Sequence, residues 1–249
     1  MRYGSCLLMA ATLTAAPAWA VSFVVCPVYR DTDAGRKSGC WIATDGASGV
    51  RYDVTDSPNK PQVGRMILVE GEPAGTPDIC GGVPLNPVRV AVLRASCAEV
   101  LIPPEGFPSK QSVLPADSMQ PLGVARSIPA PLYSTQVWQI GFSFDDDRLM
   151  YQSVETTIEK AMLYALASRA RAVSIIGYAD VKGIMVSGRR LAEQASLARA
   201  RALMVKEALV RLGVPEATIG TTWRLDPKAI TEGAMADSSK RRVTIIVSP

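Results

Sequence analysis

The most informative gap in the 249-residue sequence is histidine, of which the chain has none. Without it, the Ser-His-Asp and Cys-His catalytic arrangements and the histidine-based zinc sites are excluded. Cell-wall glycosidases work with two carboxylates instead, and the Phe-Asp-Asp-Asp stretch at 144–147 supplies acids. Nothing places a second carboxylate opposite them across a cleft. We therefore predict a protein that is not an enzyme and that carries no metal or cofactor.

A strong charge of either sign is also missing. The net charge is +4, and charged residues make up 20% of the chain. This charge is too small and too dispersed to indicate a nucleic-acid partner. Hydrophobic residues make up 48%, so the length allows one large domain or two small ones, each with a core.

Long apolar segments are scarce as well. Residues 1–20 combine a positive start, a short apolar run and an Ala-Trp-Ala ending, which predicts a signal peptide cleaved after Ala20. A membrane anchor is the alternative, but the run is too short to span comfortably. No other segment reaches spanning length. We expect a mature chain that is soluble beyond the inner membrane.

The cysteines are confined to the first half of the chain. Cys6 precedes the apolar run, and four remain after cleavage: Cys26, Cys40, Cys80 and Cys97. An even number in an exported chain indicates two disulfides, for which three pairings exist. We expect Cys26–Cys40 and Cys80–Cys97, because each closes a short loop. Zinc is the weaker alternative, since the sequence has no Cys-x-x-Cys pair and no histidine.

Composition divides the mature chain into three parts. Residues 21–105 hold short runs rich in valine, isoleucine and aromatics, separated by Gly, Pro, Asp and Asn. They predict a small all-β barrel or sandwich, with an OB-like fold as one option. Residues 106–134 predict an extended tether and the domain boundary, because they are interrupted by Pro108, Pro115, Pro121, Pro129 and Pro131.

Residues 135–249 alternate between strand and helix patterns. Strands are expected at 136–144 and 172–178, each followed by a segment with apolar residues at helical spacing. The second helix is expected to stop near Gly213, and two strands follow at 221–225 and 241–247. The order β-α-β-α-β-β predicts a sheet with both helices on one face, and an α+β class for the whole chain.

Four motifs of this half resemble the OmpA-like domain, the peptidoglycan-associating module of bacterial envelope proteins. They are IGFSFDDD, IIGYADVKG, QASLARARALMVKEALVRLGV and SKRRVTIIV, and they occur in the family's order within residues 137–247. The helix motif is similar to the family pattern with Arg201 at its arginine. Choosing Arg199 instead would put Glu207 at a core leucine position.

With the predicted signal peptide and disulfides, the resemblance implies a periplasmic protein of a Gram-negative envelope, associated with the cell wall or outer membrane, which would tether its N-terminal domain or a partner to the wall. It also implies a site for the diaminopimelate of the peptidoglycan stem peptide. That residue ends in an ammonium and a carboxylate on one carbon. Asp180 would accept hydrogen bonds from the ammonium, and Arg201 would grip the carboxylate with two parallel bonds. By the same resemblance, Asp145, Gln194 and Arg241 are expected at the site. Strand neighbours point to opposite sides, so Arg242 is the alternative to Arg241.

Simpler interpretations and departures from the family stay open. Asp180 could cap a turn, Arg201 could be solvated on a basic helix, and Asp145 could cap a helix. The loop between Gly183 and Gln194 is longer than the family's usual form. Residues that differ from the motif are Tyr178, Ala179, Gln194, Ala198 and Lys240. The alternative function is a structural component of an envelope-spanning secretion, pilus or conjugation machine, with outer-membrane or secretion-system proteins as partners.

Overall fold

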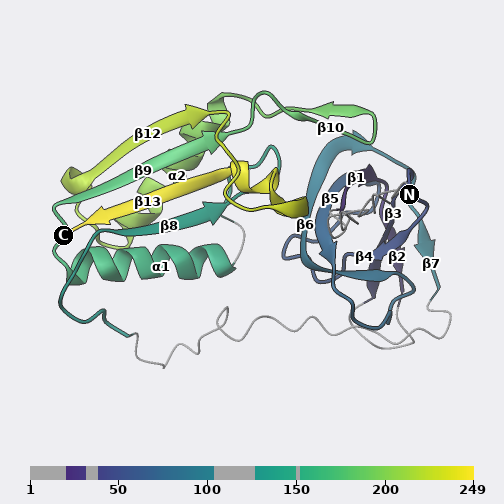
Figure 1. Cartoon of the computed structure of the whole chain (residues 1–249), viewed down its shortest axis with the longest axis horizontal. Helices are drawn as coiled ribbons and strands as arrows, with labels where there is room; N and C mark the ends of the chain where they lie inside the picture. Colours follow the sequence, from purple (N-terminus) through teal and green to yellow (C-terminus); the bar gives the residue numbers. More distant parts are fainter. Residues whose placement is uncertain (1–20, 32–38, 104–126, 150–151) are drawn as a thin grey trace, which may run out of the picture.

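A computed structural model describes residues 21–31, 39–103, 127–149 and 152–249. The predicted signal peptide lies outside these residues, as does most of the predicted tether. Two sheets occupy opposite ends of the molecule (Figure 1). We call residues 21–103 the N-terminal domain and residues 127–249 the C-terminal domain. Within the described ranges, no helix is long and apolar enough to cross a membrane.

The N-terminal domain is a seven-stranded sheet in the order β1-β5-β6-β4-β3-β2-β7. Its strands are β1 (Val21–Val25), β2 (Val28–Arg30), β3 (Cys40–Thr44), β4 (Arg51–Asp53), β5 (Arg65–Pro73), β6 (Val83–Ser96) and β7 (Leu101–Ile102). The β-rich prediction is therefore confirmed, whereas its assignment to a barrel or an OB-like fold is not.

Strand β5 is buried on both faces, which is unusual for a small antiparallel sheet with one solvated side. On one face, Ile67 and Val69 belong to the core of the N-terminal domain. On the other, Leu68 packs in a second cluster that includes Val186 and Phe144 from the C-terminal domain. Side chains alternate along a strand, so Glu70 shares the face of Leu68. Strand β5 thus contributes one of its faces to the interface between the two domains.

The predicted disulfide pairing is wrong. The cysteines do form two disulfides, but these join Cys26 to Cys97 and Cys40 to Cys80. Strand pairing explains the first: β1 and β6 flank β5 and both run antiparallel to it, so Cys26 and Cys97, which follow them, meet beside the start of β5. Proximity in the sheet, rather than loop length, determines the pairing.

The C-terminal domain is a four-stranded sheet in the order β12-β9-β13-β8. Its elements are β8 (Gln136–Gly141), α1 (Gln152–Ala167), β9 (Ala172–Ala179), β10 (Ile184–Val186), β11 (Arg189–Leu191), α2 (Ser196–Arg211), η1 (Glu216–Thr218), β12 (Ile219–Leu225), η2 (Gly233–Met235), η3 (Ser238–Lys240) and β13 (Arg242–Ser248). Strand β12 pairs parallel with β9, while β13 runs antiparallel to β9 and β8. The predicted β-α-β-α-β-β order is confirmed, with a β10–β11 hairpin added.

One apolar core joins both helices to the sheet. Alternate residues of β9, from Val173 to Ala179, are buried under α2. Gly177 is required there, because a Cβ at this position would lie 1.9 Å from the carbonyl oxygen of Ala198 in α2. The close approach of α2 brings Arg201 to the carboxyl end of β9, where the candidate site lies.

The β10–β11 hairpin extends from the C-terminal domain towards the N-terminal domain (Figure 1). The hydroxyl of Ser187 at its tip accepts a hydrogen bond from the backbone N–H of Val24 in β1 at 3.0 Å. Val186 is buried in the cluster beneath Leu68. The sequence predicted this segment only as an unusually long loop, whereas it forms part of the domain interface.

Candidate functional site

The aspartate predicted to bind the ligand's ammonium lies where β9 ends. Asp180 is 6% exposed, and its carbonyl oxygen accepts the backbone N–H of Glu193 at 3.0 Å. Its carboxylate Oδ2 lies 3.4 Å from Nζ of Lys240. Asp180 therefore presents a carboxylate at the edge of the sheet, and that carboxylate already has a cationic partner.

The arginine predicted to grip the ligand's carboxylate is sealed inside the domain. Arg201 is 0% exposed, and a guanidinium has five N–H donors. All five are used. The acceptors are the carbonyl oxygens of Ser143, Asp146 and Tyr178 and both carboxylate oxygens of Glu193. Arg201 and Asp180 both donate to the carboxylate of Glu193, so they are brought together, but the guanidinium is already bonded to an internal carboxylate.

Glu193 is the residue that the sequence prediction missed. Its side chain is 0% exposed, and four donors converge on its carboxylate. Arg201 supplies two, at 2.5 and 3.0 Å. The backbone N–H groups of Asp145 and Asp180 supply the others, at 3.1 and 3.0 Å. The available signal was a lone acid in the lengthened loop, directly before the Gln194 that begins the helix motif.

These donors form a carboxylate-binding pocket. They come from three separate segments: helix α2, the loop after β8 and the end of β9. Charge-assisted bonds to a bidentate guanidinium are the strongest hydrogen bonds that a protein offers a carboxylate. The pocket and the carboxylate of Asp180 adjoin, because the N–H of Asp180 is one wall of the pocket. The site thus holds a bound anion beside a bound cation.

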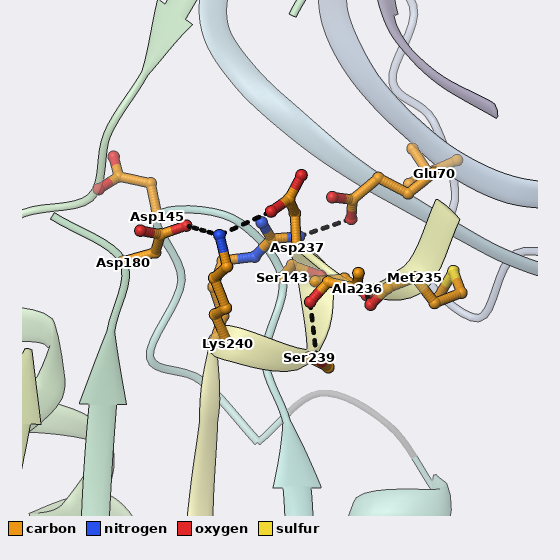
Figure 2. A network of polar contacts seen from close by, with 12 residues as sticks. Glu70, Ser143, Asp145, Asp180, Met235, Ala236, Asp237, Ser239 and Lys240 are labelled. Atoms are coloured by element: carbon orange, nitrogen blue, oxygen red, sulfur yellow. Dashed lines mark hydrogen bonds and ion pairs between the residues drawn. The ribbon is translucent and has the colours of Figure 1, made fainter. Parts of the chain in front are cut away.

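The cation is Lys240, at the end of η3. Figure 2 shows its ammonium between the carboxylates of Asp180 and Asp237, and the Asp237 contact is the shorter, at 2.7 Å. The pKa of Lys240 is raised, first by the hydrogen bond to Asp237 and also by the charges of both aspartates, against the opposing effect of burial. The side chain is 23% exposed and stays protonated at neutral pH.

Arg241 faces away from this site and towards the N-terminal domain. Its Nη2 lies 2.5 Å from Oε2 of Glu70 in β5, and both side chains are almost completely buried. Figure 2 shows Glu70 reaching into the network from the neighbouring domain. The adjacent Arg242 instead stacks on the ring of Tyr178, 4.4 Å from its centroid. The two neighbours point in different directions, although Arg241 follows η3 and only Arg242 belongs to β13.

Asp145 and Gln194 lie at the margin of the site. Asp145 has a positive φ of 57°, which aspartate tolerates, and its N–H points into the pocket. Its carboxylate pairs with Arg94 of the N-terminal domain at 3.0 Å, where Arg94 is 82% exposed. Gln194 is exposed on the loop before α2.

A cleft of about 690 Å³ opens beside Asp145, between the two domains. Its lining includes the acidic loop 145–147, and Lys60, Arg94 and Arg189 contribute basic side chains. The cleft adjoins the site at Ser143 and Asp145, whose backbone groups bond to Arg201 and Glu193. Across the described parts of the chain, no three His, Cys, Asp or Glu residues gather as a metal site would require.

The C-terminal domain is similar to solved OmpA-like domains. One is the OmpA-like domain of FopA1 from Francisella tularensis, at 20% identity over 46% of this chain and 72% of that one, with a TM-score of 0.36. The peptidoglycan-associated lipoprotein of Burkholderia pseudomallei is 20% identical over 44% of this chain and 89% of that one, with the same TM-score.

A third similar structure is the cell wall anchor of the T6SS from Pseudomonas aeruginosa, at 18% identity over 46% of this chain and 81% of that one, with a TM-score of 0.36. No family model and no curated protein matches the sequence. These identities and TM-scores assign the chain neither a family nor a function.

Proposed function

We propose that this is a periplasmic cell-envelope protein that binds peptidoglycan non-covalently and tethers its N-terminal domain to the wall. The observation that carries the proposal is the carboxylate pocket of Arg201 and two backbone N–H groups, built directly beside the carboxylate of Asp180. A ligand with a carboxylate and an ammonium on one carbon matches that pairing of groups. The diaminopimelate of a stem peptide is such a ligand.

In this proposal Asp180 contacts both ends of the ligand. Its backbone N–H is a donor for the carboxylate, and its side chain is an acceptor for the ammonium. The ligand's ammonium takes the place of Lys240, which keeps its shorter contact with Asp237. A stem-peptide lysine has the ammonium without the carboxylate, so it would leave the pocket unused.

The test is sedimentation of the mature protein with diaminopimelate-type sacculi. Asp180→Asn keeps the size of the side chain and removes its charge. Losing one half of a desolvated charged contact costs about 2–5 kcal/mol, so Kd should rise at least ten-fold. Glu207→Gln is the matched control, because Glu207 is an exposed carboxylate of α2 paired with Arg211 and away from the site.

Arg201 is unsuitable for this test, because its removal would leave Glu193 charged and unpaired in the core. Sedimentation of the wild type and Glu207→Gln, but not of Asp180→Asn, supports the proposal. Equal sedimentation of all three means that the wall is bound elsewhere. If the wild type itself stays in solution, the protein is not a wall tether.

A second candidate function has its own supporting observation. Arg241, expected at the ligand site, is bonded to Glu70 of the N-terminal domain. An OmpA-like fold in which a residue expected to bind the ligand instead joins two domains suits a structural component of an envelope-spanning machine. Site-specific photo-crosslinking from Trp223, exposed on edge strand β12, tests it. This candidate predicts a specific envelope-protein adduct whether or not sacculi are bound.

A further inference from the structure

The carboxylate pocket is filled by the protein itself. We infer that Glu193 is an intramolecular ligand, whose carboxylate occupies the place of the stem peptide's carboxylate and must leave before the wall can bind. This inference rests on the proposed function. It adds a residue that sets the strength of wall binding and that the family motif does not name.

The geometry of the pocket supports a ligand rather than a plain structural ion pair. A structural pair needs only Arg201, whereas Glu193 also accepts backbone N–H bonds from two other segments. Donors from three segments aimed at one carboxylate form a site that would hold any carboxylate of suitable shape. None of these donors belongs to Glu193, and Arg201 is held independently by three backbone carbonyl oxygens.

The position of Glu193 in the chain permits that withdrawal. It lies in the short segment between β11 and α2, outside both elements. A single backbone hydrogen bond, from the N–H of Glu193 to the carbonyl oxygen of Asp180, ties it to the end of β9. The N–H of Leu197 in helix α2 donates to the carbonyl oxygen of the adjacent Gln194, so the withdrawal requires movement of Glu193 and not of the whole segment.

Lys240 is the cationic counterpart of Glu193. Its ammonium is held by Asp180, where the ligand's ammonium would lie, and it has Asp237 as a second partner. The site is therefore occupied at both ends by side chains of opposite charge. Ligand binding exchanges two internal groups for the two groups of one external residue.

This occupancy weakens wall binding in the wild type. The apparent Kd of a protein equals the intrinsic Kd divided by the fraction of molecules whose site is open. If Glu193 fills the pocket in roughly nine of ten molecules, emptying it lowers the apparent Kd about ten-fold. We expect Glu193→Ala to bind diaminopimelate-type sacculi at least that much more tightly than the wild type.

The first experiment tests the pocket without the wall. Glu193→Ala leaves Arg201 buried without its anion, so the variant should be less stable and should regain stability in acetate. Acetate at ten times its Kd should shift the folding equilibrium of the variant about eleven-fold. Sodium chloride at equal ionic strength and acetamide, the neutral isostere, should do much less, and the wild type, with one open pocket in ten, should shift only about two-fold.

The second experiment measures sedimentation of wild type, Glu193→Ala and Glu193→Gln with sacculi. Glutamine keeps the volume but turns an N–H₂ towards the donors, so it should weaken the occupancy and serves if the alanine variant does not fold. Acetate rescue together with tighter wall binding supports the inference. A folded Glu193→Ala that ignores acetate overturns it, because the pocket then does not receive carboxylates.

Two further outcomes separate this inference from the proposed function. Acetate rescue with unchanged sacculus binding overturns the competition but leaves wall binding in place. Acetate rescue with no sedimentation of any variant overturns both the competition and wall binding, leaving a carboxylate pocket with another use.

Discussion

Replacing Glu70 with alanine removes one half of the ion pair that joins the two domains. Glu70 lies on the buried outer face of β5, and its partner Arg241 precedes β13. Both side chains are almost completely excluded from water, and they lie beside the apolar cluster that contains Leu68 and Val186. The substitution leaves the guanidinium of Arg241 buried without an anion.

The expected cost follows from that burial. Removing one partner of a buried ion pair destabilises a protein by about 3–5 kcal/mol, because the remaining charge is uncompensated. The intact pair has a smaller net effect. Among the described residues, Oε1 of Glu70 and Nε of Arg241 have no hydrogen-bond partner, so part of the desolvation is not offset. The double variant Glu70→Leu/Arg241→Met should therefore recover most of the loss.

Urea unfolding with the disulfides intact measures these effects. Trp41 reports on the N-terminal domain, while Trp138 and Trp223 report on the C-terminal domain, and circular dichroism reports on both. We expect one coincident transition in the wild type and two separate transitions in Glu70→Ala. A loss below about 1 kcal/mol would refute the reasoning, because exposed ion pairs contribute no more than that. Two transitions in the wild type would equally show that the domains are not coupled.

Two other predictions concern the interior of each domain. Gly177→Ala should lower the free energy of unfolding by about 3 kcal/mol or more, since its Cβ would meet the carbonyl oxygen of Ala198 at 1.9 Å and push α2 away from β9; thermal unfolding followed by circular dichroism checks this. Replacing Cys40 and Cys80 together with serine should cost about 4 kcal/mol, because the disulfide closes a separation of 40 residues. Peptide mapping without reduction should recover these two cysteines in one cross-linked fragment, and a Cys26–Cys40 fragment would contradict the structure.

The C-terminal elements could be predicted because their signals are local. The buried face of α2 carries Ala198, Ala202, Val205 and Leu209, spaced by four and three, and Gly213 ends the helix with a φ of 97°. Alternation in β9 likewise distinguishes its buried face from its half-exposed face. Helix and strand periods are properties of neighbouring residues, so the sequence alone reveals them.

The disulfide pairing could not be obtained in this way. It depends on which strands pair, and β1 meets β5 across more than forty residues of sequence. Short loops looked favourable because closing a loop costs more entropy as it lengthens. That cost is small compared with the pairing of whole strands, which had already brought the distant cysteines together. A sheet of unknown order therefore leaves all three pairings open.

Prediction of the site is limited in a similar way. The motif identifies the arginines that donate hydrogen bonds, but not the carboxylates that accept them. The sequence identified Arg201 and Arg241 as charged groups near Asp180, and the structure places them at this end of the domain. A guanidinium that leaves water must acquire an anion. Glu193 and Glu70 provide those anions from a lengthened loop and from another domain, and neither occupies a position that the motif names.

Lys240, one of the departures from the family pattern, has a further consequence when it is considered together with Glu193. Taken singly, the departure at Lys240 alters only a polar support of the charged pair. Taken with Glu193, it supplies the second member of an internal anion and cation that match the two charges of the proposed ligand. A binding site can therefore keep all its donors and acceptors while side chains of the same protein occupy it. The free energy that favours the ligand is then the difference between its bonds to the site and the bonds of those side chains. Small changes at Glu193 or Lys240 should consequently alter wall binding more than changes of equal size at Gln194, which lies exposed at the margin.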